Sequence, residues 1–212
     1  MSKRAIILSA VPVSTAVGPY VRPGDFIVAC DAGYRNCVRL GCKPDIIVGD
    51  FDSAPCPQQD TDDIVVLPHV KDDTDTEYAA KLAAQKGFDE VLLLGALGGR
   101  RVEHTLANLC TGLGLEQRGI RAALQDERSR ITFVLPGESR RYPKEEFFYF
   151  SAFPMEGRAE GVYEKGSFYE LEDAVLTAGY PLGVSNEYAE GSDCITISTR
   201  QGALVVVETI AD

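Results

Sequence analysis

Short apolar runs alternate with longer amphipathic stretches over residues 1–125. The runs are rich in Ile, Val and Leu and are bounded by polar turns, a pattern typical of strands buried on both faces of a parallel sheet. We expect such strands at residues 5–8, 25–29, 46–48, 64–67, 91–94 and 121–124.

Between these runs, three stretches have the length and spacing of helices, at residues 33–40, 74–86 and 104–117. The first is followed by Gly41 and the second by Gly87. Glycine is favoured after the last turn of a helix because it readily adopts a left-handed backbone conformation. Strands that alternate with helices predict right-handed βαβ units, whose ligands bind at the carboxyl ends of the strands.

After residue 126 the pattern changes to short strand-like runs separated by Pro-Gly, Glu-Gly and Gln-Gly turns, without a helical period. This spacing predicts a β-sandwich or barrel. We therefore expect two domains. Residues 1–127 form a Rossmann-like α/β domain, a parallel sheet with helices on both faces, and residues 128–212 form a β-sandwich. The runs lie at residues 131–135, 147–150, 161–163, 174–177, 194–198 and 203–207.

Acidic side chains gather where two of the predicted strands end. Asp50 and Asp52 directly follow the run 46–48, and alternate side chains of an extended loop point the same way. Asp72, Asp73 and Asp75 lie just before or at the start of the helix 74–86. Aspartates in loops also form Asx-turns and helix caps, which would account for one or two of them. Clustered carboxylates need a cation, and Mg²⁺ held with substrate phosphates indicates chemistry on a nucleotide.

A glycine-rich turn, residues 95–99, follows the run 91–94 and leads through Arg100 and Arg101 into a helix. Such a turn exposes backbone amides to a phosphate, and arginines add positive charge. It matches neither the Walker A nor the dinucleotide-binding fingerprint. His104 lies close to the two arginines in sequence. Its side chain could either have a structural role or contact a nucleotide.

The amino-acid composition narrows the class of protein and the kinds of binding partner that we expect. Of the 212 residues, 45% are hydrophobic and 25% are charged, as in globular proteins. The net charge of −11 argues against binding to nucleic acid or to anionic membranes. No apolar run is long enough for a membrane helix, and the opening run reads as a first strand rather than an export signal. Six cysteines without paired spacing indicate reduced thiols and a cytoplasmic protein.

Taken in order, several motifs over nearly the whole chain resemble thiamine pyrophosphokinases of the bacterial type. The motifs are Asp31-Ala32-Gly33, Pro44-Asp45, Gly49-Asp50-Phe51-Asp52-Ser53, Lys71-Asp72, Thr74-Asp75, Glu77, Gly95, Gly98-Gly99, His104, Asn108, Leu171-Glu172-Asp173-Ala174, Leu176-Thr177 and Gly183-Val184-Ser185-Asn186-Glu187.

The resemblance implies an enzyme that moves the diphosphate of ATP to the thiamine hydroxyl and leaves AMP. It implies Mg²⁺ as cofactor and a homodimer with active sites at the subunit interface. Asp50, Asp52 and Asp75 would hold the metal, with Asp31 and Asp72 among the catalytic residues. The nucleotide would contact Thr74, Arg100, Arg101, His104 and Asn108, and thiamine would contact Lys71, Ser185 and Asn186.

The chain departs from the family pattern at Glu103, where aspartate is usual, and at the additional arginine of the 100–101 pair. It also contains no Trp to stack on thiamine, so that Tyr188 or another tyrosine would substitute. Two alternatives are a diphosphokinase for another small alcohol, such as a pterin, and a nucleotide- or thiamine-binding protein without turnover.

Overall fold

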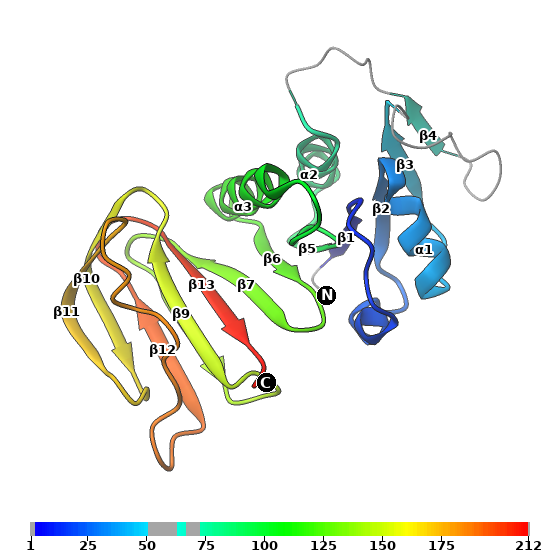
Figure 1. Ribbon diagram of the computed structural model, residues 1–212. Helices are drawn as coiled ribbons and strands as arrows, with labels where there is room; N and C mark the ends of the chain where they lie inside the picture. Colours follow the sequence, from blue (N-terminus) through cyan, green and yellow to red (C-terminus); the bar gives the residue numbers. More distant parts are fainter. Residues whose placement is uncertain (1–2, 51–62, 67–72, 212) are drawn as a thin grey trace. The chain divides into compact units, whose positions relative to one another are not determined.

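The computed structural model describes residues 3–50, 63–66 and 73–211, and the chain divides into two compact units, Met1–Glu127 and Arg128–Asp212. In the first unit (Figure 1), strands alternate with helices as the apolar pattern predicts. Its elements are β1 (Arg4–Leu8), the 3-10 segment η1 (Thr15–Tyr20), β2 (Phe26–Cys30), the 3-10 segment η2 (Asp31–Gly33), α1 (Tyr34–Leu40), β3 (Ile46–Gly49), β4 (Asp63–Val66), α2 (Asp75–Gln85), β5 (Glu90–Leu94), α3 (Val102–Gln117) and β6 (Arg121–Gln125).

The strands of the first unit pair in parallel, in the order β4-β3-β2-β1-β5-β6. The chain starts in the middle with β1 and adds β2, β3 and β4 on one side. It then crosses back to place β5 and β6 on the other side. The connections after β1 and β5 therefore leave the sheet in opposite directions, and a crevice opens between the carboxyl ends of these two strands.

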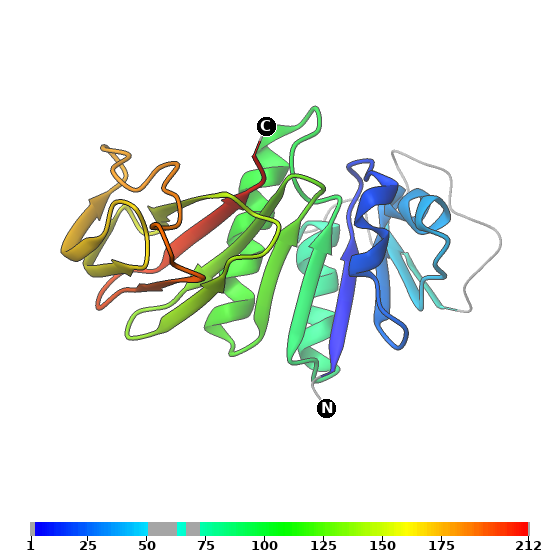
Figure 2. The same cartoon turned by 90° about the horizontal axis from the view of Figure 1, so that it is seen from below.

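Helices cover both faces of this sheet. α2 contacts α3 and strands β1 to β3, whereas α1 contacts η1, β1 and β2 on the opposite side (Figures 1 and 2). Ile6 and Leu8 of β1 pack in a cluster with Val17 of η1 and Cys37 of α1. The intervening Ile7 is also fully buried. Burial on both faces explains why β1 is apolar at consecutive positions, and the parallel fold expected from the sequence is confirmed.

Two glycines permit backbone segments to come very close together. A Cβ atom on Gly33 would lie 1.9 Å from the carbonyl oxygen of Leu8, and one on Gly49 would lie 3.1 Å from the Cα atom of Asp31. Because real Cβ contacts are longer, a side chain at Gly33 would separate η2 from the end of β1. These glycines are thus required by packing rather than by an unusual φ angle.

The described residues of the second unit form strands joined by turns and loops, without a helix. The strands are β7 (Ser129–Val134), β8 (Ser139–Pro143), β9 (Tyr149–Pro154), β10 (Arg158–Lys165), β11 (Leu171–Thr177), β12 (Cys194–Ser198) and β13 (Leu204–Thr209). β13 pairs antiparallel with both β7 and β9, and a second antiparallel sheet has the order β11-β10-β12-β8. β8 was not predicted from the sequence.

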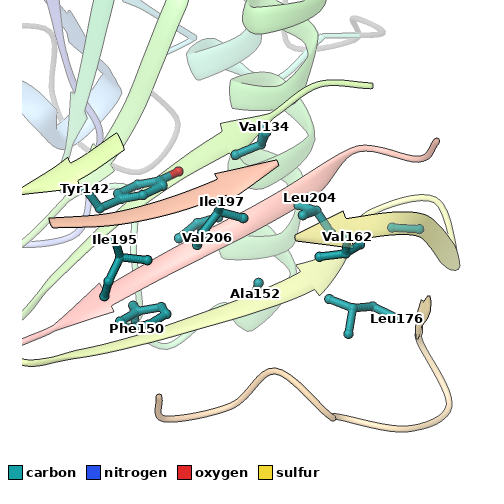
Figure 3. Packing of buried hydrophobic residues seen from close by; sticks show 11 residues of the cluster. Val134, Tyr142, Phe150, Ala152, Val162, Leu176, Ile195, Ile197, Leu204 and Val206 are labelled. Atoms are coloured by element: carbon teal, nitrogen blue, oxygen red, sulfur yellow. The ribbon is translucent and has the colours of Figure 1, made fainter. Parts of the chain in front are cut away.

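An apolar cluster joins the two sheets of this unit. Phe150 and Val206 from one sheet meet Tyr142, Ile195 and Ile197 from the other (Figure 3). Each of these side chains is almost fully buried. Two sheets packed face to face over a shared core make a β-sandwich, as the sequence predicts.

A polar network is buried beside this core. The side-chain amide of Asn186 donates to Glu164 and to the backbone carbonyl of Tyr169, and its oxygen accepts from the amides of Tyr169 and Glu187. Both lone pairs and both protons of the Asn186 amide are thereby used. Glu164 is only 1% exposed, and its burial raises the pKa of the carboxyl from the ordinary 4.5 to about 7, although hydrogen bonds from Asn186 and Ser167 act against the shift.

Among the described helices, none has the length and apolar character that crossing a membrane requires.

We expect Gly33→Ala to lower the free energy of unfolding by about 3 kcal/mol, because the added methyl group overlaps the Leu8 carbonyl. The control is Gly114→Ala in α3, where a Cβ meets nothing within 4 Å and alanine should stabilise the helix by about 1 kcal/mol. Urea denaturation followed by circular dichroism measures both. Equal effects of the two substitutions would contradict the close-packing account.

The raised pKa of Glu164 predicts an unusual pH dependence of the free energy of unfolding. Its pKa is higher in the folded state, so the folded protein binds more protons than the unfolded chain between pH 4.5 and about 7. The stability contributed by this group is therefore present below pH 4.5 and falls as the pH rises to about 7, by about 3 kcal/mol. Glu164→Gln should remove this slope in urea denaturation at several pH values, whereas Glu172→Gln on the exposed side of β11 should keep it. An unchanged slope in Glu164→Gln would refute the assignment.

Candidate active site

A cavity of about 400 Å³ lies in the first unit, at the carboxyl ends of β1, β2, β3 and β5 and at the start of α2 and α3. Its position is the crevice that the strand order creates. Eight of the residues singled out in the sequence line it, from four separate segments of the chain. They are Asp31, Asp50, Thr74, Asp75, Arg100, Arg101, His104 and Asn108.

The other predicted site residues are placed differently. Ser185 and Asn186 belong to the second unit. Asp52, Lys71 and Asp72 lie outside the described residues, so their predicted roles stay predictions.

Asp31 follows β2 directly and has a φ of +46°, in the left-handed region that non-glycine residues rarely adopt. The absence of a side chain on Gly49 lets the end of β3 approach the backbone of Asp31. Asp50, the next residue, then lines the same cavity as Asp31. Strained backbone of this kind is concentrated at functional sites, where neighbouring structure holds it in place.

Asp75 is the first residue of α2, and the side chain of Thr74 caps this helix by accepting from the amide of Glu77 at 3.1 Å. The next residue, Thr76, lies 2.9 Å from Ser9, hydroxyl to hydroxyl, and both are buried. This hydrogen bond ties the first turn of α2 to the end of β1. The carboxylate of Asp75 is therefore carried by a capped helix end that is fixed to the central strand.

The glycine-rich turn after β5 lies directly against the loop after β1. Gly95 has a φ of +66°, and a Cβ atom there would lie 2.6 Å from the carbonyl oxygen of Val11. Asn108 of α3 donates to the carbonyl of Ala96 at 2.8 Å and is buried. Asn108 therefore lines the cavity and also fixes the shape of the turn.

Arg101 and Glu103 form an exposed pair at the start of α3, with 2.8 Å between Arg101 Nε and Glu103 Oε1. The hydrogen bond from Arg101 lowers the pKa of Glu103. Glu103, one of the departures from the family pattern, thus orients the arginine. No side chain caps α3, and the amide of His104 donates to the carbonyl of Arg101 at 3.0 Å, so the amides of Val102 and Glu103 are the ones offered to an anion together with Arg100 and Arg101.

The loop after β1 was not predicted as part of the site. Its residues Ser9, Ala10, Val11 and Pro12 line the cavity, but their types do not indicate binding or catalysis. Asn36 of α1, which is buried and bonds this loop three times, was also not predicted. Asn36 Nδ2 donates to the carbonyls of Ser9 at 2.8 Å and Val11 at 2.9 Å, and its Oδ1 accepts from the Val13 amide at 3.2 Å. The position after a predicted central strand was the available signal for the loop.

The donors in the cavity suit a hard cation. Asp31, Asp50 and Asp75 all line it, and Mg²⁺ characteristically takes one or two carboxylates and completes its shell with phosphates and water. In the described parts of the chain, no group of three or more Asp, Glu, His or Cys side chains could hold a metal unaided. The described aspartates of the cavity therefore fit a magnesium ion that is held together with phosphates.

In the second unit, Ser185 has a φ of +54°, and its amide donates to the side chain of Ser151 at 2.9 Å. Asn186 is occupied by the buried network with Glu164 and Tyr169. Ser185 is exposed at the surface, and Asn186 holds the segment that presents it.

Comparisons with known proteins match both units. The family model "Thiamin pyrophosphokinase, catalytic domain" matches residues 19–124, and "Thiamin pyrophosphokinase, vitamin B1 binding domain" matches residues 141–204. The curated thiamine pyrophosphokinase of Bacillus subtilis is 27% identical over 187 residues, which cover 86% of each chain.

Solved structures of thiamine pyrophosphokinases are also similar to this chain. A crystal structure of thiamine pyrophosphokinase from Bacillus subtilis superposes with a TM-score of 0.87 at 23% identity, over 99% of this chain and all of the other, and so shows the shared fold. A thiamin pyrophosphokinase family protein from Enterococcus faecalis has a TM-score of 0.80 at 25% identity, with both chains fully covered. The catalytic-domain match alone takes in half of the sequence, and the chain belongs to the thiamine pyrophosphokinase family.

Proposed function

We propose that this enzyme, a thiamine diphosphokinase by its family, takes the diphosphate from ATP and uses Mg²⁺ in the cavity of the first unit. The observation that carries the proposal is the convergence of Asp31, Asp50 and Asp75 with Arg100 and Arg101 on one cavity. Carboxylates for a metal and arginines for phosphates are what phosphoryl-type transfer requires, since it depends on positioning and charge neutralisation.

In the reaction, the hydroxyl oxygen of thiamine bonds to the β-phosphorus of ATP. The bond from the β-phosphorus to the oxygen that bridges to the α-phosphorus breaks, and its electron pair leaves with AMP. The hydroxyl proton passes to a base, for which the aspartates that line the cavity are candidates. Mg²⁺ bound by Asp50, Asp52 and Asp75 would neutralise the charge on the transferring phosphates.

The remaining residues bind and orient the two substrates. Arg100, Arg101 and the first amides of α3 offer positive charge to the phosphates, and Thr74, His104 and Asn108 line the walls of the same cavity. Asp72 and Lys71 are proposed from the sequence to act near the transferred phosphates and thiamine. For the second unit, we propose that Ser185 contacts thiamine directly, with Asn186 supporting its backbone.

We further propose a homodimer in the cytoplasm. Val102 and Leu106, one turn apart on α3, are 67% and 60% exposed next to the cavity-lining Arg101, and a second subunit would cover this apolar surface. The cysteines of the described residues are all free thiols, in keeping with a reducing compartment. Neither alternative gains support, because one matched family is a pyrophosphokinase catalytic domain and the other binds vitamin B1.

The direct test incubates purified protein with ATP, Mg²⁺ and thiamine and resolves the products by chromatography. Equal amounts of AMP and thiamine diphosphate are expected. ADP with thiamine monophosphate, or AMP formation that does not depend on thiamine, would contradict the proposed transfer.

We predict that Asp75→Asn lowers kcat by about 100-fold or more, because it removes a charge that serves the phosphates in the transition state. Asp73→Asn is the matched control. Asp73 lies two residues away, pairs with Lys81 at 2.6 Å and does not line the cavity. The control should keep most of the activity, and similar losses in both variants would count against the assignment. Asp52→Asn is expected to behave like Asp75→Asn.

We predict that Asn36→Leu raises the KM for ATP by about tenfold while the KM for thiamine stays unchanged. The substitution removes three hydrogen bonds, to Ser9, Val11 and Val13, and a tenfold effect, about 1.4 kcal/mol, corresponds to the part of their contribution that reaches ATP binding. Val38→Ala, on the exposed side of the same helix, should change neither constant. A uniform loss of kcat in Asn36→Leu would indicate a general folding defect instead.

A further inference from the structure

Two cysteines meet where α1 ends. Gly41 has a φ of +66°, its amide donates to the carbonyl of Val38 at 3.2 Å, and the amide of Cys42 donates to the carbonyl of Cys37 at 3.0 Å. This pair of bonds is the Schellman motif, which brings the side chains at the positions of Cys37 and Cys42 into contact. The Cys42 sulfur lies 3.7 Å from the carbonyl oxygen of Cys37.

The backbone geometry is compatible with a disulfide. A carbonyl oxygen lies about 2.4 Å and an amide nitrogen about 1.5 Å from its own Cα atom, so a 3.0 Å hydrogen bond keeps the two Cα atoms within about 7 Å. Cysteines whose Cα atoms are further apart than this cannot be bridged without backbone movement. Cys37 and Cys42 satisfy this limit without rearrangement of α1.

The two thiols differ in environment. Cys37 is 1% exposed, whereas Cys42 is partly exposed. A hydrogen bond from Cys37 lowers the pKa of Cys42 to about 7, and the same bond, together with burial, raises the pKa of Cys37. An accessible, low-pKa thiol beside a buried one is the arrangement of an attacking and a resolving cysteine.

We propose that Cys37 and Cys42 form a thiol–disulfide exchange site for small disulfides, separate from the nucleotide cavity. The Cys42 thiolate attacks one sulfur of the small disulfide, forms a mixed disulfide and releases the first thiolate. The sulfur of Cys37 then attacks the Cys42 sulfur, loses its proton and releases the second small thiol. In total, two protein thiols and one small disulfide yield one protein disulfide and two small thiols.

The site is independent of the proposed substrates. Neither sulfur lines the cavity, whereas Cys30 does, and Cys30 donates to the backbone carbonyl of Asp75 at 3.5 Å. Bound ATP should therefore shield Cys30 and leave exchange at Cys37 and Cys42 unaffected. The inference does not depend on which reaction the cavity performs.

The test treats the folded, reduced protein with oxidised glutathione, blocks free thiols with iodoacetamide and maps tryptic peptides by mass spectrometry. Trypsin cleaves after Arg35 and Arg39 and so separates Cys37 from Cys42. A disulfide between them joins two peptides, and dithiothreitol separates these again. We expect this joined product in the wild type, at the same rate with and without saturating ATP.

The variants make the mapping decisive. The peptide that carries Cys42 also contains Cys56, so Cys42→Ser must abolish the joined product. Cys37→Ser should instead accumulate glutathione on Cys42, because the resolving thiol is gone. Cys110→Ser, which removes an exposed thiol of α3, should change nothing. A joined product that persists in Cys42→Ser, no joined product in the wild type, or exchange that ATP blocks would each overturn the proposal.

Discussion

The candidate site depends on backbone segments that approach more closely than any side chain would allow. The end of β1 lies against Gly33 on one side and Gly95 on the other, and Gly49 lets β3 reach Asp31. A methyl group at Gly33 or Gly95 would meet a carbonyl oxygen of the β1 strand or loop. Because the cavity is made from the ends of these strands, its walls can be this close only where glycine is present.

Buried polar side chains then fix the positions that the glycines make possible. Asn36 bonds the loop after β1, Thr76 bonds Ser9, and Asn108 bonds the turn after β5. Each of these bonds joins a loop of the cavity to a helix, so the loops have little freedom of their own. The backbone that forms the walls of the cavity is therefore held in place before any ligand arrives, which limits the conformational entropy lost on binding.

Much of this arrangement follows from the sequence. The buried strands of the first unit are apolar throughout, and the acidic and glycine-rich segments follow them directly, so Asp31, Asp50, Asp75 and Arg101 could be assigned to one edge of a sheet. The loop after β1 was not predicted to belong to the site, because Ser, Ala, Val and Pro are residue types that do not indicate a binding site. Asn36 was not predicted either. Its role depends on hydrogen bonds to a loop distant in sequence, and the residues next to Asn36 do not reveal these bonds.

The second unit shows the same limits. β8 was missed because Arg140 and Arg141 interrupt the apolar alternation, and only Tyr142 of this strand is buried in the core. Asn186 was identified by its motif, but its partners, Glu164 and Tyr169, come from other strands and turns. Pairing between segments distant in sequence decides these contacts, and a single sequence does not record it.

The protonated state of buried Glu164 has a thermal consequence. Between pH 4.5 and about 7, the folding chain takes up part of a proton from its surroundings, and the buffer must supply it. The heat measured by calorimetry then includes the ionisation heat of that buffer. The same protein at the same pH will therefore show different apparent unfolding enthalpies in buffers with different ionisation heats, although its structure is unchanged.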